Sequence, residues 1–176
     1  MNESATFEFV VTEKPEGKRK AIVILARTGL LTVIAAFVIA ALCTFPALAI
    51  LPLCLLGLVL FFWKIFNREC EYSMTSGIMT FSYIYGGGFT RRKVLELFIK
   101  DMREIAPVTD DTMPHLNAIG VAKDYRFVSS SYADDMYYAV FEKDGRLCVV
   151  YFEATERALT ILYYYNHATV KTVVTR

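Results

Sequence analysis

The chain has 176 residues, of which 55% are hydrophobic, and its formal net charge is +1. Such hydrophobicity excludes an ordinary soluble domain along the whole length. It is concentrated in one block, because the stretch from Ala21 to Trp63 contains a single charged residue, Arg27. The residues from Lys64 to Arg176 have an ordinary soluble composition, with fourteen basic and fourteen acidic side chains.

The first predicted element is a short strand at Thr6–Thr12, "TFEFVVT". Its apolar side chains Phe7, Phe9 and Val11 alternate with other residues, which is typical of a half-buried strand. The segment is too short and too polar to enter a membrane. We therefore expect it to join, as an edge strand, the sheet that follows the apolar block.

The apolar block predicts a transmembrane helical hairpin. A single helix over the block would be about 65 Å long, against a bilayer core of about 30 Å. Thr44 and Pro46 interrupt it midway, and proline cannot continue a helix. We expect spans near Ala21–Cys43 and Ala47–Phe66. A cleaved signal peptide is disfavoured, since its apolar region would have only about 7–15 residues.

The charges flanking the block predict its orientation. Four basic residues precede the first span, and two follow the second, while the turn between them has none: Lys14, Lys18, Arg19 and Lys20, then Lys64 and Arg68. Positive flanks remain in the cytoplasm, so both termini are expected there. Arg27 lies close enough to the first span's start to reach the headgroups, although an ion-path or partner role is an alternative.

Beyond the block the apolar periodicity becomes two, which predicts a β-meander. "ECEYSMT" is followed by a turn at Ser76-Gly77, "IMTFSYIY" by Gly86-Gly87-Gly88, and "FTRRKVLELFI" comes next. The glycines favour a hairpin turn over a phosphate-binding loop, because no Lys-Ser/Thr pair follows and the next element is a strand.

The C-terminal part predicts a loop, further strands and one helix. Residues 106–122 contain two prolines and read as a long loop. "DYRFV" and "MYYAVFEKDGRLCVVYF" predict strands, the latter as a hairpin with Asp144-Gly145 at its turn. From Thr155, a capping residue, the spacing becomes helical. We expect Tyr163–Tyr165 to pack over the sheet, and the tail from Ala168 to be loose or a short strand.

The polar residues reveal no chemical reaction. The cysteines have no CxxC spacing: Cys43 and Cys54 fall in the spans, and Cys70 and Cys148 in the following domain. His115 and His167 lack obvious partners in the sequence. The acidic pairs Asp110-Asp111 and Asp134-Asp135 are more simply explained as solvated loops than as a cation site.

Two stretches carry a resemblance to a known family: "EYSMTSGIMTFSYIYGGGFTRRKVLELFIKDMREIAP" and "YYAVFEKDGRLCVVYFEATERALTIL". They resemble an uncharacterised family of small bacterial two-span membrane proteins, similar to membrane-anchored PH-like proteins. The resemblance implies an α+β fold, in which an antiparallel β-sheet or barrel is closed by a C-terminal helix. The family supplies no activity, cofactor or catalytic residues.

The expected organisation is a cytoplasmic segment (1–20), a transmembrane hairpin (21–66) and a cytoplasmic PH-like domain (67–176). The favoured function is a non-catalytic, membrane-anchored module that binds an unknown protein partner, without cofactor, metal or nucleic acid. The alternative is the sensing of anionic lipid by Arg91, Arg92 and Lys93, although alternation places Arg92 on the opposite face from the other two. An enzyme using Cys70 or Cys148, or a role within the spans, has less support.

Overall fold

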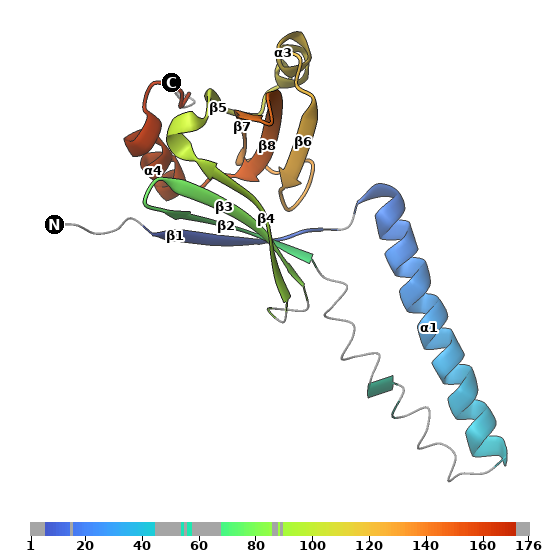
Figure 1. The fold of residues 1–176 in the computed structure, drawn as a ribbon. Coiled ribbons are helices and arrows are strands. Elements are labelled where there is room, and N and C mark those ends of the chain that lie inside the picture. Colours follow the sequence, from blue (N-terminus) through green and yellow to red (C-terminus); the bar gives the residue numbers. More distant parts are fainter. Residues whose placement is uncertain are drawn as a thin grey trace.

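The computed structural model describes residues 6–14, 16–44, 54, 56–57, 68–85, 88 and 90–171. They form a β domain with two four-stranded sheets, from which the long helix α1 (Gly17–Thr44) extends (Figure 1). The first sheet has the order β1 (Phe7–Thr12), β2 (Arg68–Thr75), β3 (Ile78–Tyr85), β4 (Thr90–Phe98). The second has the order β5 (Glu104–Pro107), β7 (Met136–Lys143), β8 (Arg146–Glu153), β6 (Lys123–Phe127).

In the first sheet, β2, β3 and β4 form the meander that the alternation of apolar and polar residues predicts. β1 is added at the edge of this meander. β1 pairs antiparallel with β2 from Phe7↔Met74 to Thr12↔Glu69, which confirms the predicted edge strand. Phe7 and Val11 are buried, so the apolar face of β1 contributes to the core. Of the glycine turn, Gly86 and Gly87 lie outside the described residues, whereas Gly88 has a φ of 111°, a left-handed conformation that glycine adopts readily.

The second sheet contains the predicted β7–β8 hairpin and one unexpected pairing. Asp144 (φ 51°) and Gly145 (φ 71°) form its turn, as the Asp-Gly pair predicts. β6 pairs in parallel with β8, which lies between β6 and β7 in the sheet. The expectation of a wholly antiparallel sheet was therefore wrong for this strand. The alternation of apolar and polar residues predicts a strand, but it does not reveal the order or direction of the strands in the sheet.

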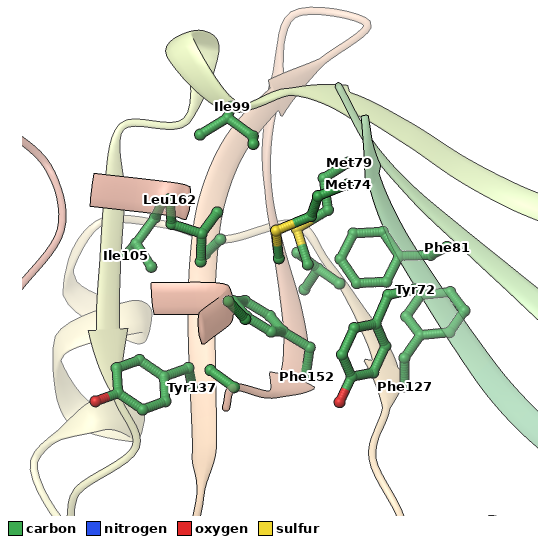
Figure 2. Close-up of a cluster of buried hydrophobic side chains, with 14 of the residues drawn as sticks. Tyr72, Met74, Met79, Phe81, Ile99, Ile105, Phe127, Tyr137, Phe152 and Leu162 are labelled. Carbon is green, nitrogen blue, oxygen red and sulfur yellow. The ribbon is translucent and has the colours of Figure 1, made fainter. Parts of the chain in front are cut away.

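The core lies between the two sheets and beneath the C-terminal helix α4 (Glu156–Asn166). Figure 2 shows its aromatic and sulfur-containing centre, where Tyr72 and Phe81 from the first sheet face Phe127 and Phe152 from the second. The Tyr72 hydroxyl donates to the backbone carbonyl of Glu153, so this buried polar group is satisfied. Each aromatic side chain that is removed from water favours the folded state by roughly 1.5–3 kcal/mol.

Helix α4 begins where the sequence predicts. The Thr155 side chain accepts a hydrogen bond from the Ala158 amide, and Ala158, Ile161 and Leu162 are buried. The expected packing of the tyrosine run was wrong in part. Tyr163 and Tyr164 are 53% and 78% exposed, and only the third tyrosine of the run packs against the core.

A helix stands where a loop was expected. Residues 106–122 contain α3 (Thr112–Ala118), with Pro114 in its first turn. Proline is tolerated there, because the amides of the first turn have no partner within the helix. The two prolines therefore gave a misleading signal. After α4, Val170 forms an isolated parallel bridge with Ile105, and the rest of the predicted tail beyond Lys171 lies outside the described residues.

Helix α1 coincides with the first predicted span. Among the described residues, the segment Lys20–Thr44 is the one helix long and apolar enough to cross a membrane, and its apolar side chains are mostly exposed. A signal sequence meets the same criterion. The second predicted span, Ala47–Phe66, lies outside the described residues except for Cys54, Leu56 and Gly57.

Candidate functional site

The candidate site lies at one end of the first sheet. It is the end at which the chain leaves the sheet towards α1. β1 ends at Thr12 before α1, and β2 begins at Arg68 after the apolar block. Arg68 pairs with Tyr85, and Tyr85 with Thr90. The turn between β3 and β4 therefore lies at the same end of the sheet. We call this region the helix-proximal end.

The basic residues predicted as a lipid site follow that turn on β4. Arg91 and Lys93 are opposite Ile84 and Ser82, whereas Arg92 is opposite Tyr83, on the other face of the sheet. This arrangement agrees with the alternation in the sequence. The three cations lie at one end of the sheet, but they do not point to one place.

Two of these cations have carboxylate partners. Arg91 Nη2 lies 2.6 Å from Glu71 Oε1, and Lys93 forms an ion pair with Glu96. The Glu71 side chain is only 5% exposed, and its burial raises the pKa of the carboxyl group, although Arg91 opposes this. Arg91 and Lys93 remain 60% and 56% exposed, so their charged ends can still reach a ligand.

A loop that sequence reasoning treated only as solvated is attached to the start of α1. The Lys14 amide donates to the Ser129 carbonyl at 2.8 Å. Glu16 accepts hydrogen bonds from the backbone nitrogen and the hydroxyl of Ser131, at 3.0 and 2.7 Å. These two bonds lower the pKa of the Glu16 carboxyl. Tyr132, next in the loop, is 89% exposed. No pattern in the sequence indicates these contacts between distant segments.

His115 belongs to a polar cluster, which corrects the expectation that it stands alone. His115 Nε2 lies 2.8 Å from Glu104 Oε2, while Lys171 Nζ and the Tyr138 hydroxyl lie 2.6 and 3.2 Å from Glu104 Oε1. Burial alone would raise the pKa of Glu104, but the hydrogen bonds from Lys171 and His115 outweigh it, and the pKa is lowered. The cluster borders a cavity of about 370 Å³. We interpret it mainly as a link between α3, the sheet and the tail.

The remaining reactive groups are not brought together. Cys70 and Cys148 are 1% and 4% exposed, and Cys43 and Cys54 lie in the apolar block. His167 contacts the Tyr163 ring. Within the part of the chain that the structure describes, no three His, Cys, Asp or Glu side chains could hold a metal ion. Asp110-Asp111 and Asp134-Asp135 thus belong to no such group.

Comparison with known proteins gives a family match. A family model described as "Bacterial PH-like domain (DUF6106)" matches residues 4–172, which is nearly the whole chain. No curated protein and no solved structure matches. The match includes both the first strand and the apolar block.

Proposed function

Since this chain belongs to a family of bacterial PH-like domains, we propose that it is a non-catalytic binding module anchored at the cytoplasmic face of the cell membrane. PH-like domains of unknown function are consistent with binding rather than catalysis. The observation that carries the anchoring proposal is the exposed apolar surface of α1, which begins five residues after β1 ends. An apolar helix of this length is stable in a bilayer and costly to leave in water.

The connections of the β domain support a position directly above the bilayer. Both chain segments that lead to the apolar block leave from the helix-proximal end. Arg68 forms an ion pair with Glu13, and its guanidinium lies 4.2 Å from the centroid of the Tyr83 ring. These contacts hold the two connections together. In this proposal the basic flanks remain in the cytoplasm with both termini, and the second span lies at Ala47–Phe66.

Membrane anchoring is tested by fractionating cells that express the full chain. We expect the protein in the membrane pellet after washing with high salt and with alkaline carbonate, and its release only by detergent. Peripheral binding through charges would be reversed by the salt wash. Release of the protein by carbonate would contradict the integral anchor. A mature chain beginning near Ala47 would instead show that the block is a cleaved signal.

A second candidate function is the sensing of anionic lipid by Arg91, Arg92 and Lys93. The observation that favours it is the register Arg68↔Tyr85↔Thr90, which brings the basic segment to the helix-proximal end. Cations near an anionic leaflet contribute about 1 kcal/mol each. The ion pairs with Glu71 and Glu96 reduce the charge available, so anionic lipid would have to compete with these carboxylates.

Amide hydrogen exchange on the full chain in nanodiscs distinguishes the two functions. If lipid is sensed, anionic phospholipid should slow exchange in β4 relative to phosphatidylcholine alone, and Arg91→Glu with Lys93→Glu should abolish the difference. Lys100→Glu, on the short helix η3 (Ile99–Asp101), is the control. Equal exchange in both lipids would remove this candidate. Crosslinking in cells, followed by mass spectrometry, would then identify the protein partner that the first proposal requires.

A further inference from the structure

A second group of basic residues surrounds a cavity at the β7–β8 hairpin. The cavity has a volume of about 440 Å³, within the range of small-ligand sites. Lys123 at the start of β6, Lys143 at the end of β7 and Arg146 at the start of β8 line it, together with Tyr125 and Cys148. Three strands therefore contribute one cation each.

The strand register places these side chains on one face of the second sheet. Cys148 is opposite both Phe141 and Lys123, and Lys143 is opposite Arg146. Cys148 is buried in the core, so residues two positions away on these strands extend the same face. The cavity therefore lies on the core-facing side of the second sheet, next to the apolar core.

Among the described residues, the cations in this cavity have no ion-pair partners. No carboxylate of the described residues forms an ion pair with Lys123, Lys143 or Arg146, whereas Arg91, Arg103 and Arg126 each have one. Lys143 and Arg146 are directly opposite each other in the hairpin, and like charges in that position are destabilising.

Two of the ammonium groups lie over the same aromatic ring. Lys123 Nζ and Lys143 Nζ lie 4.8 and 5.9 Å from the centroid of the Tyr125 ring. Asp144, in the turn, is the one acidic residue that lines the cavity. Three positive charges and one negative charge leave a formal excess of two positive charges at the cavity.

We propose that this basic cavity binds the phosphate group of a soluble ligand. A phosphomonoester carries about −1.5 to −2 charges at neutral pH, which matches the excess in the cavity. Arginine can bind such a group through two parallel hydrogen bonds, and the lysines add point charges. The flanking Tyr125 ring offers an apolar surface for the rest of the ligand.

The position of the cavity favours a soluble ligand over a lipid headgroup. Figure 1 shows α3, which leads directly into the start of β6, on the side of the domain away from the far end of α1. The helix-proximal end and its basic segment are separate from this cavity. The inference rests on the binding part of the proposed function and names its ligand class, and it does not depend on how the chain is anchored.

The test is a titration of the full chain in neutral detergent micelles, followed by amide NMR of Asp144 and Gly145. Inorganic phosphate and phosphoserine are the probes, with sodium chloride at equal ionic strength as the reference. We expect saturable shifts with both probes and none with the salt. Lys143→Gln with Arg146→Gln should weaken binding at least tenfold. Lys100→Gln, whose ammonium lies 5.5 Å from the Phe98 ring outside the cavity, should leave binding unchanged.

Three results would overturn the inference: no saturable shift, equal weakening by the Lys100 variant, or shifts that arise only in nanodiscs with anionic phospholipid. The last would assign the cavity to a lipid headgroup. If the double variant does not fold, Lys123→Gln alone carries the same test. Carbonate extraction of each variant is measured in parallel, so that failure of the phosphate site is distinguishable from failure of the membrane anchor.

Discussion

Glu16 and Ser131, which are 115 positions apart in the chain, are joined by two hydrogen bonds to the Glu16 carboxylate. Glu16 directly precedes α1, and Ser131 belongs to the loop between β6 and β7. The contact therefore joins the start of the helix to the β domain. This attachment of α1 to the domain lies outside the two sheets.

The first prediction is that Glu16→Gln loosens this junction without unfolding the domain. A neutral amide is a weaker acceptor than a carboxylate, so the loop should separate from the start of α1 more often. Amide hydrogen exchange should become faster at Ser129–Tyr132 and remain unchanged in β2 and β3. Glu156→Gln, on the exposed first turn of α4, serves as the control. Unchanged exchange in the loop would show that the contact does not hold it.

The second prediction concerns the pH dependence contributed by Glu104. Its pKa in the folded state lies below its ordinary value of 4.5. The stabilisation is therefore fully present above that value and is lost as the pH falls through the lowered folded pKa. Glu104→Gln should destabilise the domain by about 1–3 kcal/mol at pH 7.

Thermal melts of this variant and the wild-type chain should accordingly converge as the solution is acidified. Glu142→Gln, which removes an exposed ion pair with Arg103, should cost less than about 1 kcal/mol. A destabilisation by Glu104→Gln that does not change with pH would mean that packing, rather than charge, accounts for the effect.

The third prediction is that Gly77→Ala is more harmful than Gly145→Ala. Both glycines have positive φ values, 81° and 71°, and alanine in this conformation costs about 1–2 kcal/mol. A Cβ atom at Gly77 would also lie 3.0 Å from the Tyr165 ring, whereas at Gly145 it meets nothing within 4 Å. Chemical denaturation in detergent should give a larger loss for Gly77→Ala. Equal losses would show that Tyr165 moves aside without cost.

The fourth prediction tests the orientation of the anchor by cysteine labelling. Native Cys70 and Cys148 are too buried to report, so a cysteine-free background is needed. Tyr132→Cys is on the exposed loop beside the start of α1, and Thr44→Cys is at the other end of that helix. A membrane-impermeant maleimide should label the Thr44 variant in intact cells and the Tyr132 variant only after permeabilisation. The reverse pattern would place the β domain outside the cell.

Much of the fold could be predicted from the sequence, because its signals are local. The period-two runs gave β2, β3, β4, β7 and β8, and the spacing after Thr155 gave α4. The position of β6 beyond β8 could not be predicted, since strand order depends on long-range contacts. α3 was missed because prolines indicate a loop, although a first helical turn accepts them.

The candidate site was less accessible to sequence reasoning. The sequence shows the basic run Arg91, Arg92 and Lys93. It does not show that Glu71 pairs with Arg91 and Glu96 with Lys93, because these pairs depend on the strand register and on local geometry. His115 looked isolated, because Glu104, which also binds Lys171, reaches it only through folding. The cavity at Lys123, Lys143 and Arg146 escaped notice for the same reason, since its cations are dispersed along the chain.

The pairing of β1 with β2 has a consequence for the biogenesis of this protein. Glu13 and Arg68 are 55 positions apart, and the apolar block lies between them. At a synthesis rate of about 5–20 residues per second, β1 waits roughly 3–11 seconds on the ribosome before its partner strand exists. In the proposed topology, the apolar block enters the membrane during that interval. A chain that threads the block an odd number of times leaves β1 and β2 in different compartments and cannot complete the first sheet. Completion of the first sheet, with burial of Phe7 and Val11, therefore requires that β1 and β2 lie on the same side of the membrane.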